Sequence, residues 1–289
     1  MPHFKLLLIC CSLISGSLVA RAAEELPVGQ KVKLAYKFRM GEVLRYGVKH
    51  SADIETTIDG LTQEAETKSE SIKAWKVTDV LPNGEIEFVH LVEVVRMSNR
   101  VPNRALTEYD SERDKTPPPG FESAARNVKV PLTVIRMTPA GEIVSREVKQ
   151  PQPEVTDDMP ITLRLPDKPI AVGEEWDESY DVAVEEKSGT KQIRARRLCN
   201  LESVQTGIAT ISVEYQLLTP VSPLVESQLA ERLAKGTVRF DIAKGRIVSQ
   251  QQDVDRRILG FSGDTSKMHF VSRLEERLLK PQERLAKKP

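Results

Sequence analysis

The sequence predicts a mainly β protein: a strongly curved antiparallel sheet, half-barrel-like, built from two related halves with one helix packed on it. Three observations favour this fold class. Apolar and polar residues alternate with a period of two along most of the chain, and Gly-containing turn signals separate the alternating stretches. In addition, the phrase "GEIVS" at 141–145 returns 104 residues later as "GRIVS" at 245–249.

The first half opens with two alternating stretches. In 31–38, "KVKLAYKF", the apolar residues fall on one face and lysines on the other, which is typical of a half-buried strand. After a turn at Gly41, the alternation continues over 44–58. "DG" at Asp59 and Gly60 predicts a hairpin turn, because type I′ turns need a positive φ that glycine adopts cheaply. "PNG" at 82–84 closes a second hairpin, and an apolar strand follows it.

The second half shows the same pattern. Trp176, Tyr180, Val182 and Val184 share one face of a strand, "SG" at 188–189 predicts a turn, and a return strand runs to about residue 201. After "QTG" at 205–207, alternation resumes over 209–217. Strands over 246–260 and 265–279, turned at 263–264, complete the sheet.

A helix is predicted over 222–235. Ser222 is a typical N-cap, Pro223 suits the first helical position, and Gly236 is the predicted left-handed stop. Val225 and Leu229 form an apolar stripe together with Leu233. The stretch "GFESAARN" at 120–127 is a candidate for a shorter helix at the matching place in the first half.

The order of these elements indicates a divergent duplication. Each half begins with a Gly-Glu turn, at Gly41 and Gly173, and ends on a strand followed by G-x-I-V-S. The first copy is about 28 residues longer, and we assign the surplus to a polar, Pro-rich loop at 99–121. The predicted organisation is a signal peptide at 1–22, halves at 23–158 and 159–280, and a charged tail at 281–289 that we expect to fray.

The N-terminus has the pattern of a secretory signal peptide. Lys5 precedes an apolar run over 6–20, and Ala20-Arg21-Ala22 is an A-x-A site, so we expect cleavage after Ala22 and an extracytoplasmic location, periplasmic or secreted. That run of 15 residues is shorter than the about 20 that span a bilayer, and we expect no membrane span in the mature chain. A lipoprotein anchor is the less favoured alternative, because Cys10 and Cys11 lie inside the run rather than after it.

The charge of the mature chain argues against nucleic acid as a partner. Without Lys5 and Arg21 the basic residues number 40, against 42 acidic ones, so the net charge is near −2. Such a balance gives no field that attracts a polyanion. Cleavage also leaves Cys199 as the one cysteine, so the mature fold has no internal disulfide and depends on core burial.

No motif predicts catalysis, a metal site or a cofactor. His50, His90 and His269 lack metal-ligand spacing along the chain. A metal site assembled from residues of distant strands remains an alternative. "GFSGD" at 260–264 departs from the G-x-S-x-G nucleophile elbow and is better explained as a turn. Cys199 lies in a predicted strand without a nearby histidine, which favours a core position. We therefore predict that the protein is not an enzyme.

Three stretches carry a resemblance to a known family: "LAYKFRMGEVLRYGV", "LPDKPIAVGEEW" and "FDIAKGRIVS". With these, most of the mature chain resembles a planctomycete-like bacterial family of exported proteins of unknown function. The elements are also similar to the curved-sheet envelope proteins of the LolA and LolB type. That wider resemblance implies a concave apolar face that holds acyl chains, and neither resemblance supplies catalytic residues.

Two hypotheses of different class follow for the function. In the first, an exported non-enzymatic β-protein of the cell envelope binds an apolar molecule or lipid, or an envelope protein, on its concave face. The candidate ligand-binding residues are Val225, Leu229, Leu233, Tyr46 and Tyr180. The helix stripe is then either a gate that moves or plain core. In the second, the protein is a structural or interaction module that works through exposed strand edges or the 99–120 loop. An uncharacterised enzyme is the third alternative.

Overall fold

The computed structural model describes residues 27, 29–150, 162–186 and 189–285. The predicted signal peptide, its cleavage site after Ala22, the boundary between the halves at 158/159 and residues 286–289 of the tail lie outside the described residues.

The described residues form fourteen strands and a few short helical segments. The first half contains β1 (Lys31–Val32), β2 (Val43–Ile58), β3 (Leu61–Val80), β4 (Ile86–Arg100), β5 (Thr107–Asp110), α1 (Glu122–Arg126), β6 (Pro131–Met137) and β7 (Ile143–Val148). The second contains β8 (Ile170–Ala171), β9 (Glu175–Glu186), β10 (Gly189–Gln205), β11 (Ile208–Leu217), α2 (Pro223–Leu229), the 3₁₀ turn η1 (Ala230–Arg232), β12 (Lys235–Asp241), β13 (Arg246–Leu259) and β14 (Lys267–Leu278).

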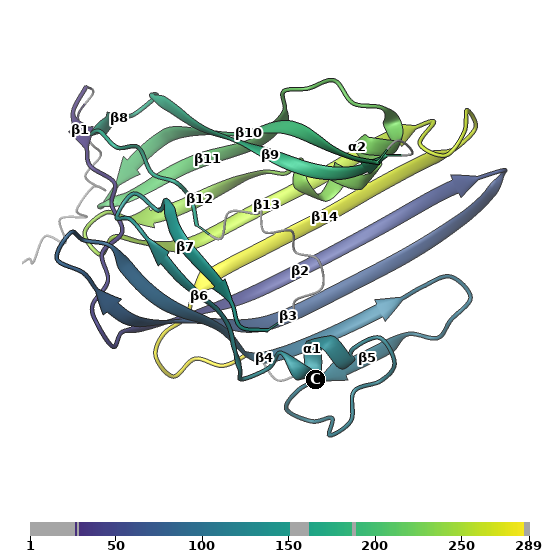
Figure 1. The fold of residues 1–289 in the computed structure, drawn as a ribbon, viewed down its shortest axis with the longest axis horizontal. Coiled ribbons are helices and arrows are strands. Elements are labelled where there is room, and N and C mark those ends of the chain that lie inside the picture. The colour runs from purple at the N-terminus through teal and green to yellow at the C-terminus, as the bar shows by residue number, and fades with distance from the viewer. Residues whose placement is uncertain (1–26, 28, 151–161, 187–188, 286–289) are drawn as a thin grey trace, which may run out of the picture.

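One open, curved antiparallel sheet dominates the molecule, which confirms the predicted fold class (Figure 1). Its strand order is β7-β6-β4-β3-β2-β14-β13-β12-β11-β10-β9, with β5 added beside β4. Each half contributes its strands in the same order, and β14 joins the two sets by pairing with β2 and β13. A second sheet consists of the short strands β1 and β8.

The hydrogen bonds at the start of each half recur. Gly41 N donates to Val77 O over 3.0 Å and Val77 N donates to Glu42 O over 2.9 Å. In the second half, Gly173 N donates to Leu201 O over 2.8 Å and Leu201 N donates to Glu174 O over 3.1 Å. A β-bulge follows Val77 in β3 and Leu201 in β10, at the corresponding positions. These matches support the prediction of two related halves.

The two G-x-I-V-S phrases have the same local structure as well. Both glycines have a positive φ, +84° at Gly141 and +61° at Gly245. The register then shifts at the same place after each turn: Ile143 and Ser145 in β7 correspond to Ile247 and Ser249 in β13, and the valine between them forms the bulge. The repeated phrase therefore encodes a turn followed by a bulged strand.

Residues 31–38, predicted as a half-buried strand, form a strand over only two residues. Only Lys31–Val32 pairs as a strand, while residues 33–38 run between the two G-x-I-V-S turns. Tyr36 N donates to Pro139 O over 2.7 Å, and Lys37 N donates to Gly245 O over 3.0 Å. The alternation did predict correctly which side chains are buried, namely Leu34, Tyr36 and Phe38. Their burial comes from filling the inside of the curve rather than from joining the large sheet.

The predicted helix at 222–235 is shorter than expected. Ser222 caps it, with Oγ accepting from Val225 N at 3.4 Å, but the α-helix ends at Leu229 and η1 ends at Arg232. Gly236 is not a helix stop and lies in β12, opposite Gln252. A Cβ at Gly236 would lie 2.0 Å from Gln251 O, so the glycine permits a close approach of two strands.

Two further expectations need correction. The segment 99–121, predicted as a loop, contains β5, which pairs with β4. The tail is not frayed over its described part, because Arg45 Nη1 donates to Pro281 O and Glu283 O, and Arg277 forms an ion pair with Glu283. The short helix expected at 120–127 is present as α1.

A hydrophobic cluster fills the inside of the curve. It joins residues of the strands of both halves to the segment at 33–38 and to Leu163 and Leu165. Two smaller clusters lie under the helices, one between α2 and strands β9 and β10, the other between α1 and strands β4 and β5. We use "concave face" for the sheet face that carries these clusters.

Candidate functional site

The helix stripe lies against the concave face of the second half. Val225 and Leu229 are 0% and 2% exposed and pack on valine, isoleucine and alanine side chains of β9 and β10. Leu233 follows η1, is also buried, and lines a cleft of about 970 Å³ beside β13 and β14. Figure 1 shows α2 lying between β9 and the β13–β14 pair.

The two candidate tyrosines lie elsewhere. Tyr46 on β2 is buried in the main cluster, where its hydroxyl donates to Ile247 O over 3.2 Å and its ring lies 5.7 Å from that of Trp75. Tyr180 on β9 is half-buried and contacts both the main cluster and the α2 cluster. Burial raises the pKa of Tyr180 to about 12. The structure thus brings Tyr180 to the helix stripe and leaves Tyr46 apart from it.

A row of polar side chains on the concave face was not anticipated from the sequence. Trp75 on β3 lies opposite His90 on β4, and His90 lies opposite Thr133 on β6. Residues directly opposite in antiparallel strands place their side chains side by side on one face. Trp75 Nε1, His90 Nε2 and Thr133 Oγ1 are buried, and none of the three has a hydrogen-bond partner among the residues that the structure describes. We call Trp75, His90 and Thr133 the polar row.

An ion pair borders this polar row. Lys73 Nζ lies 2.7 Å from Glu276 Oε2, and Gln250 Nε2 donates to the same oxygen over 3.3 Å. Lys73 Nζ is also 5.6 Å from the centroid of the Trp75 ring, within the range of a cation–π contact. Because the lysine and the glutamate compensate each other, this ion pair adds no net charge beside the row.

His90 is neutral at physiological pH. Burial lowers the pKa of His90 to about 3, and the positive charges of Lys73 and Arg146 act in the same direction. A neutral imidazole offers one N–H donor and one acceptor nitrogen, an indole N–H only donates, and a hydroxyl does both. The polar row can therefore donate to and accept from an uncharged oxygen-containing group.

The wall next to the polar row is aromatic. The Trp75 ring stacks on Phe88 with centroids 4.6 Å apart, and Phe88 is fully buried. Buried polar atoms nearly always have a partner, and one without a partner costs about 1–3 kcal/mol. The combination of aromatic wall and unpartnered polar atoms is suited to a molecule with both apolar and polar parts.

Sequence reasoning missed the row because its members are far apart in the chain. Trp75, His90 and Thr133 belong to three strands, and no local spacing connects them. One signal was present: His90 occupies an inward position within the apolar stretch "IEFVHLV". Sequence reasoning treated His90 as an isolated histidine. Its neighbours across the sheet depend on the register of β3, β4 and β6, which the sequence does not specify.

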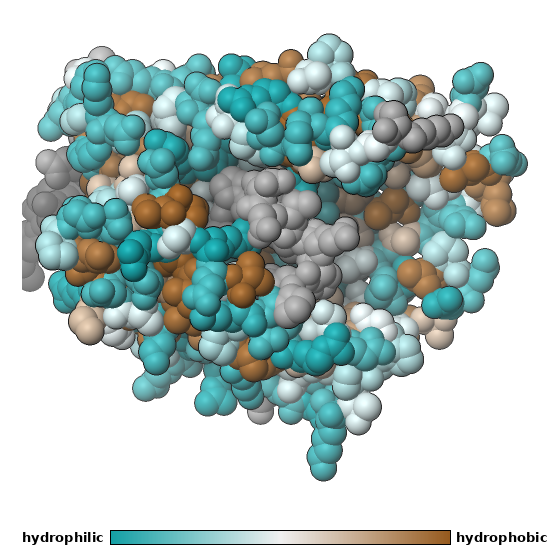
Figure 2. All heavy atoms as spheres, viewed as in Figure 1, coloured by the Kyte–Doolittle hydropathy of each residue, from teal (hydrophilic) through white to brown (hydrophobic). Residues whose placement is uncertain are grey.

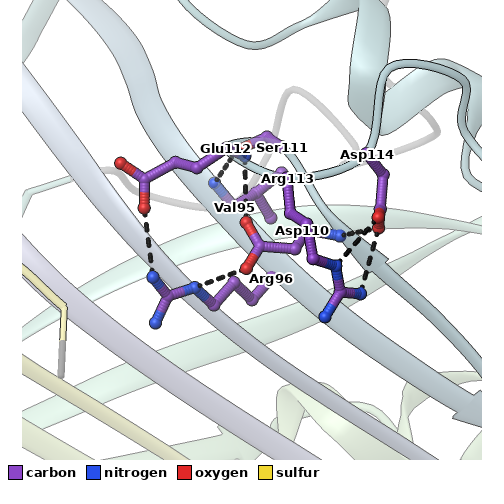
Figure 3. Close-up of polar contacts among 7 residues, drawn as sticks. All are labelled: Val95, Arg96, Asp110, Ser111, Glu112, Arg113 and Asp114. Carbon is purple, nitrogen blue, oxygen red and sulfur yellow. Dashed lines mark hydrogen bonds and ion pairs between the residues drawn. The ribbon is translucent and has the colours of Figure 1, made fainter. Parts of the chain in front are cut away.

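A second, charged cleft lies at β3, β4 and β5. It has a volume of about 470 Å³, and four acidic and four basic residues line it: Glu66, Glu70, Glu108, Asp110, Lys68, Arg96, Arg100 and Arg113. Beside it, the Arg96 guanidinium bridges Asp110 at 3.1 Å and Glu112 at 3.0 Å (Figure 3). Ser111 Oγ accepts from Val95 N, and Asp114 accepts from Asp110 N. These contacts hold the 99–121 segment on the sheet.

Other chemical features of the described residues are sparse. No group of three or more His, Cys, Asp or Glu side chains among them is arranged to hold a metal ion. Cys199 is 2% exposed, and burial raises its thiol pKa to about 12, so the thiol stays protonated at neutral pH. Within the described ranges no helix has the length and apolar character to cross a bilayer.

Comparison with known proteins gives only distant likenesses. No protein-family model matches the chain, and no curated protein matches it in sequence. Lipovitellin, in a structure concerned with its lipid–protein interactions, aligns over 88% of this chain with 13% identity and a TM-score of 0.47, and this chain spans 27% of the lipovitellin chain.

Two bacterial structures are weaker matches. A DUF1329 family protein from Desulfovibrio piger aligns over 82% of this chain and 87% of its own length, with 11% identity and a TM-score of 0.14. The MucA/MucB complex of Pseudomonas aeruginosa aligns over 83% and 89%, with 9% identity and a TM-score of 0.10. At these values the likenesses give no basis for a functional argument. The resemblance to planctomycete-like exported proteins and to the LolA and LolB type stays a prediction.

Proposed function

We propose that the protein is an exported, non-enzymatic β-protein of the cell envelope that binds an amphiphilic molecule, such as a lipid, on its concave face. The observation that carries this proposal is the polar row, in which three buried polar atoms on adjacent strands lie in register next to an aromatic wall. A ligand oxygen between them would supply the hydrogen bonds that the described residues do not.

The charges around the row favour an uncharged polar group. Lys73 is already paired with Glu276, and His90 is neutral at pH 7. An ionised headgroup would lose its hydration on entering this buried site, which is costly. An ester or a hydroxyl group can form hydrogen bonds with the polar row without bringing a charge into the buried site. The proposed ligand class is therefore a neutral lipid or another amphiphile with an ester or hydroxyl group.

The decisive experiment compares two threonines, one whose hydroxyl has a partner and one whose hydroxyl does not. Thr133 Oγ1 lacks a partner among the described residues, whereas Thr78 Oγ1 contacts Glu87 O at 3.2 Å and Glu87 Oε1 at 3.1 Å. Monooleoylglycerol would be titrated into the mature chain while tryptophan fluorescence is followed, because Trp75 lies in the row. We expect Thr133→Val to weaken binding about fivefold to tenfold, corresponding to one lost hydrogen bond.

The same variants separate binding from stability. Thr133→Val replaces a buried hydroxyl by a methyl group of the same shape, so the free energy of unfolding should stay equal or rise. Thr78→Val should lower it by about 1 kcal/mol and leave binding unchanged. Oleate, whose headgroup is charged, should bind more weakly than monooleoylglycerol. If the wild-type chain binds neither molecule, or if Thr133→Val binds as well as the wild type, the proposal is wrong.

A further inference from the structure

The polar row has a counterpart in the second half, which the strand register identifies. A β-bulge follows Val77 in β3 and Leu201 in β10, so these two residues occupy corresponding positions. The position two residues earlier in each strand, followed across the sheet in register, gives the counterpart of every row residue. The corresponding pairs are Trp75 and Cys199, His90 and Val213, and Thr133 and Gly236.

The counterpart lacks the polar groups of the row. Val213 has an aliphatic side chain and is 3% exposed, and Gly236 has no side chain. Cys199 is buried, and a thiol is a weak hydrogen-bonding group. The backbone of β13 occupies the space beside Gly236, since an added Cβ would lie 2.0 Å from Gln251 O. The second half therefore shows the same strand arrangement with the three polar side chains replaced.

The positions next to the row keep their character in both halves. Three inward neighbours are apolar in each half and belong to the main hydrophobic cluster: the pairs Val77 and Leu201, Phe88 and Ile211, and Ile135 and Val238. A basic residue is kept as well, because Lys73 corresponds to Arg197 and each is paired with a glutamate. The change from polar to apolar falls on the row and spares these neighbours.

The fold therefore does not require the polar groups of the row. A buried polar atom without a hydrogen-bond partner lowers stability, and the second half shows that an apolar set fits the same strand arrangement. Natural proteins keep such locally unfavourable groups at functional sites. The comparison of the two halves thus supports a functional role for the row on grounds that do not involve its aromatic wall.

The row also lies close to an open edge of the sheet, whereas its counterpart does not. Val148 of β7, the edge strand of the described sheet, lies opposite Thr133 and is 49% exposed. Figure 2 shows apolar side chains over the region of β6 and β7 on a face that is otherwise mostly polar. The residue that corresponds to Val148 is Gln252 in β13, and β14 continues the sheet beyond it. A ligand can thus reach the row over an apolar edge, while the counterpart lies within the sheet.

We infer that each chain binds one ligand molecule, in the first half only, and that Trp75, His90 and Thr133 determine its specificity. This inference rests on the proposed function and deepens it. A row of hydrogen-bonding groups discriminates against a ligand without a matching group, because the buried polar atoms then stay unpaired. The row should select an amphiphile that carries an uncharged oxygen over a hydrocarbon of equal length, whereas the apolar counterpart offers no such selection.

Counting the bound molecules tests the first part of the inference. Native mass spectrometry of the predicted mature chain in excess monooleoylglycerol should show one bound molecule per chain at saturation. Two bound molecules would overturn the inference and leave the proposed function intact. A chain that binds none would contradict the proposed function and the inference together.

Exchange of residues between the halves tests the second part. His90→Val places the residue of the second half in the row, and Ile135→Val does the same at the neighbouring inward position of β6. His90→Val should weaken monooleoylglycerol binding about fivefold to tenfold, and it should leave the midpoint of urea unfolding at pH 7 equal or higher. Ile135→Val should bind as the wild type does and lower the midpoint, because it removes a buried methylene group.

Selectivity between two competitors gives an additional readout. Dodecanol should displace monooleoylglycerol from the wild type more effectively than dodecane does, and the difference should shrink in His90→Val, because one hydrogen-bonding group is lost. The inference is overturned if His90→Val binds as tightly as the wild type or unfolds at a lower urea concentration than Ile135→Val. It is equally overturned if dodecanol and dodecane compete alike for the wild-type chain.

Discussion

At the scale of single residues, His90 is the most informative side chain. Burial, then the nearby positive charges, lower its pKa to about 3, whereas a histidine in an unfolded chain titrates near 6.5. As the pH falls from 6.5, the unfolded chain therefore binds the proton first. The stability that this difference provides is complete above about pH 6.5 and is lost as the pH falls toward 3.

We predict that His90→Gln makes stability less dependent on pH between 6 and 4. In the wild type this one group contributes a slope of up to about 1.4 kcal/mol per pH unit to the free energy of unfolding. Denaturant unfolding at several pH values measures the slope. His269→Gln is the control, because His269 lies near the surface with Nε2 2.8 Å from Asp255 Oδ1. A wild-type slope that persists in His90→Gln would mean that His90 is not held neutral by burial.

At the scale of elements, the two G-x-I-V-S turns need glycine for more than their backbone angle. A Cβ at Gly141 would lie 2.6 Å from Leu163 O and 2.8 Å from Tyr36 Cε2, and one at Gly245 would lie 2.6 Å from Ala35 O. The segment at 33–38 is thus held between the two turns at a distance that only glycine permits.

We predict that Gly141→Ala and Gly245→Ala each lower the free energy of unfolding by about 3 kcal/mol, from the positive φ together with the steric overlap. Gly60 is the matched control: its φ is +77°, but nothing lies within 4 Å of an added Cβ. Gly60→Ala should cost only about 1 kcal/mol. Equal losses at all three positions, measured by thermal or denaturant unfolding, would show that the segment at 33–38 is not packed against the turns.

Local features were predictable from the sequence where one physical rule acts alone. The turns at Asp59-Gly60 and at the two G-x-I-V-S phrases were identified because a positive φ strongly favours Gly, Asn and Asp. The predicted end of the helix was wrong because Gly236 permits a close approach between β12 and β13 instead of ending a helix. That role depends on the pairing with β13 and cannot be deduced from the local sequence. Residues 33–38 were misassigned because alternation records which side chains are buried, and it does not identify what buries them.

At the scale of the whole molecule, the sheet consists of two similar sets of strands joined by β14. Side-chain hydrogen bonds also connect the two sets. Arg246, within the second G-x-I-V-S turn, forms hydrogen bonds with both carboxylate oxygens of Glu42 at 2.6 and 3.3 Å. Glu42 belongs to the Gly-Glu turn that opens the first half. Motifs that are distant in sequence therefore meet at the same end of the curved sheet, near the segment at 33–38.

The polar row also belongs to this largest scale. Its three residues become neighbours only when β3, β4 and β6 pair in register, so it could not be derived from spacing along the chain. By contrast, the buried position of the stripe at Val225, Leu229 and Leu233 agrees with its apolar spacing. Leu229→Asp distinguishes a gate from plain core: loss of the whole fold would indicate core, and a folded protein with altered ligand retention would indicate a gate.

The most direct test of ligand binding is native mass spectrometry of the predicted mature chain, residues 23–289, purified from the compartment to which we predict that it is exported. We predict a co-purifying neutral amphiphile that is released on denaturation, and that is depleted in Thr133→Val but not in Thr78→Val. A bare protein mass for the wild type, with no bound molecule under conditions that preserve the fold, would contradict the proposal that the concave face binds such a ligand.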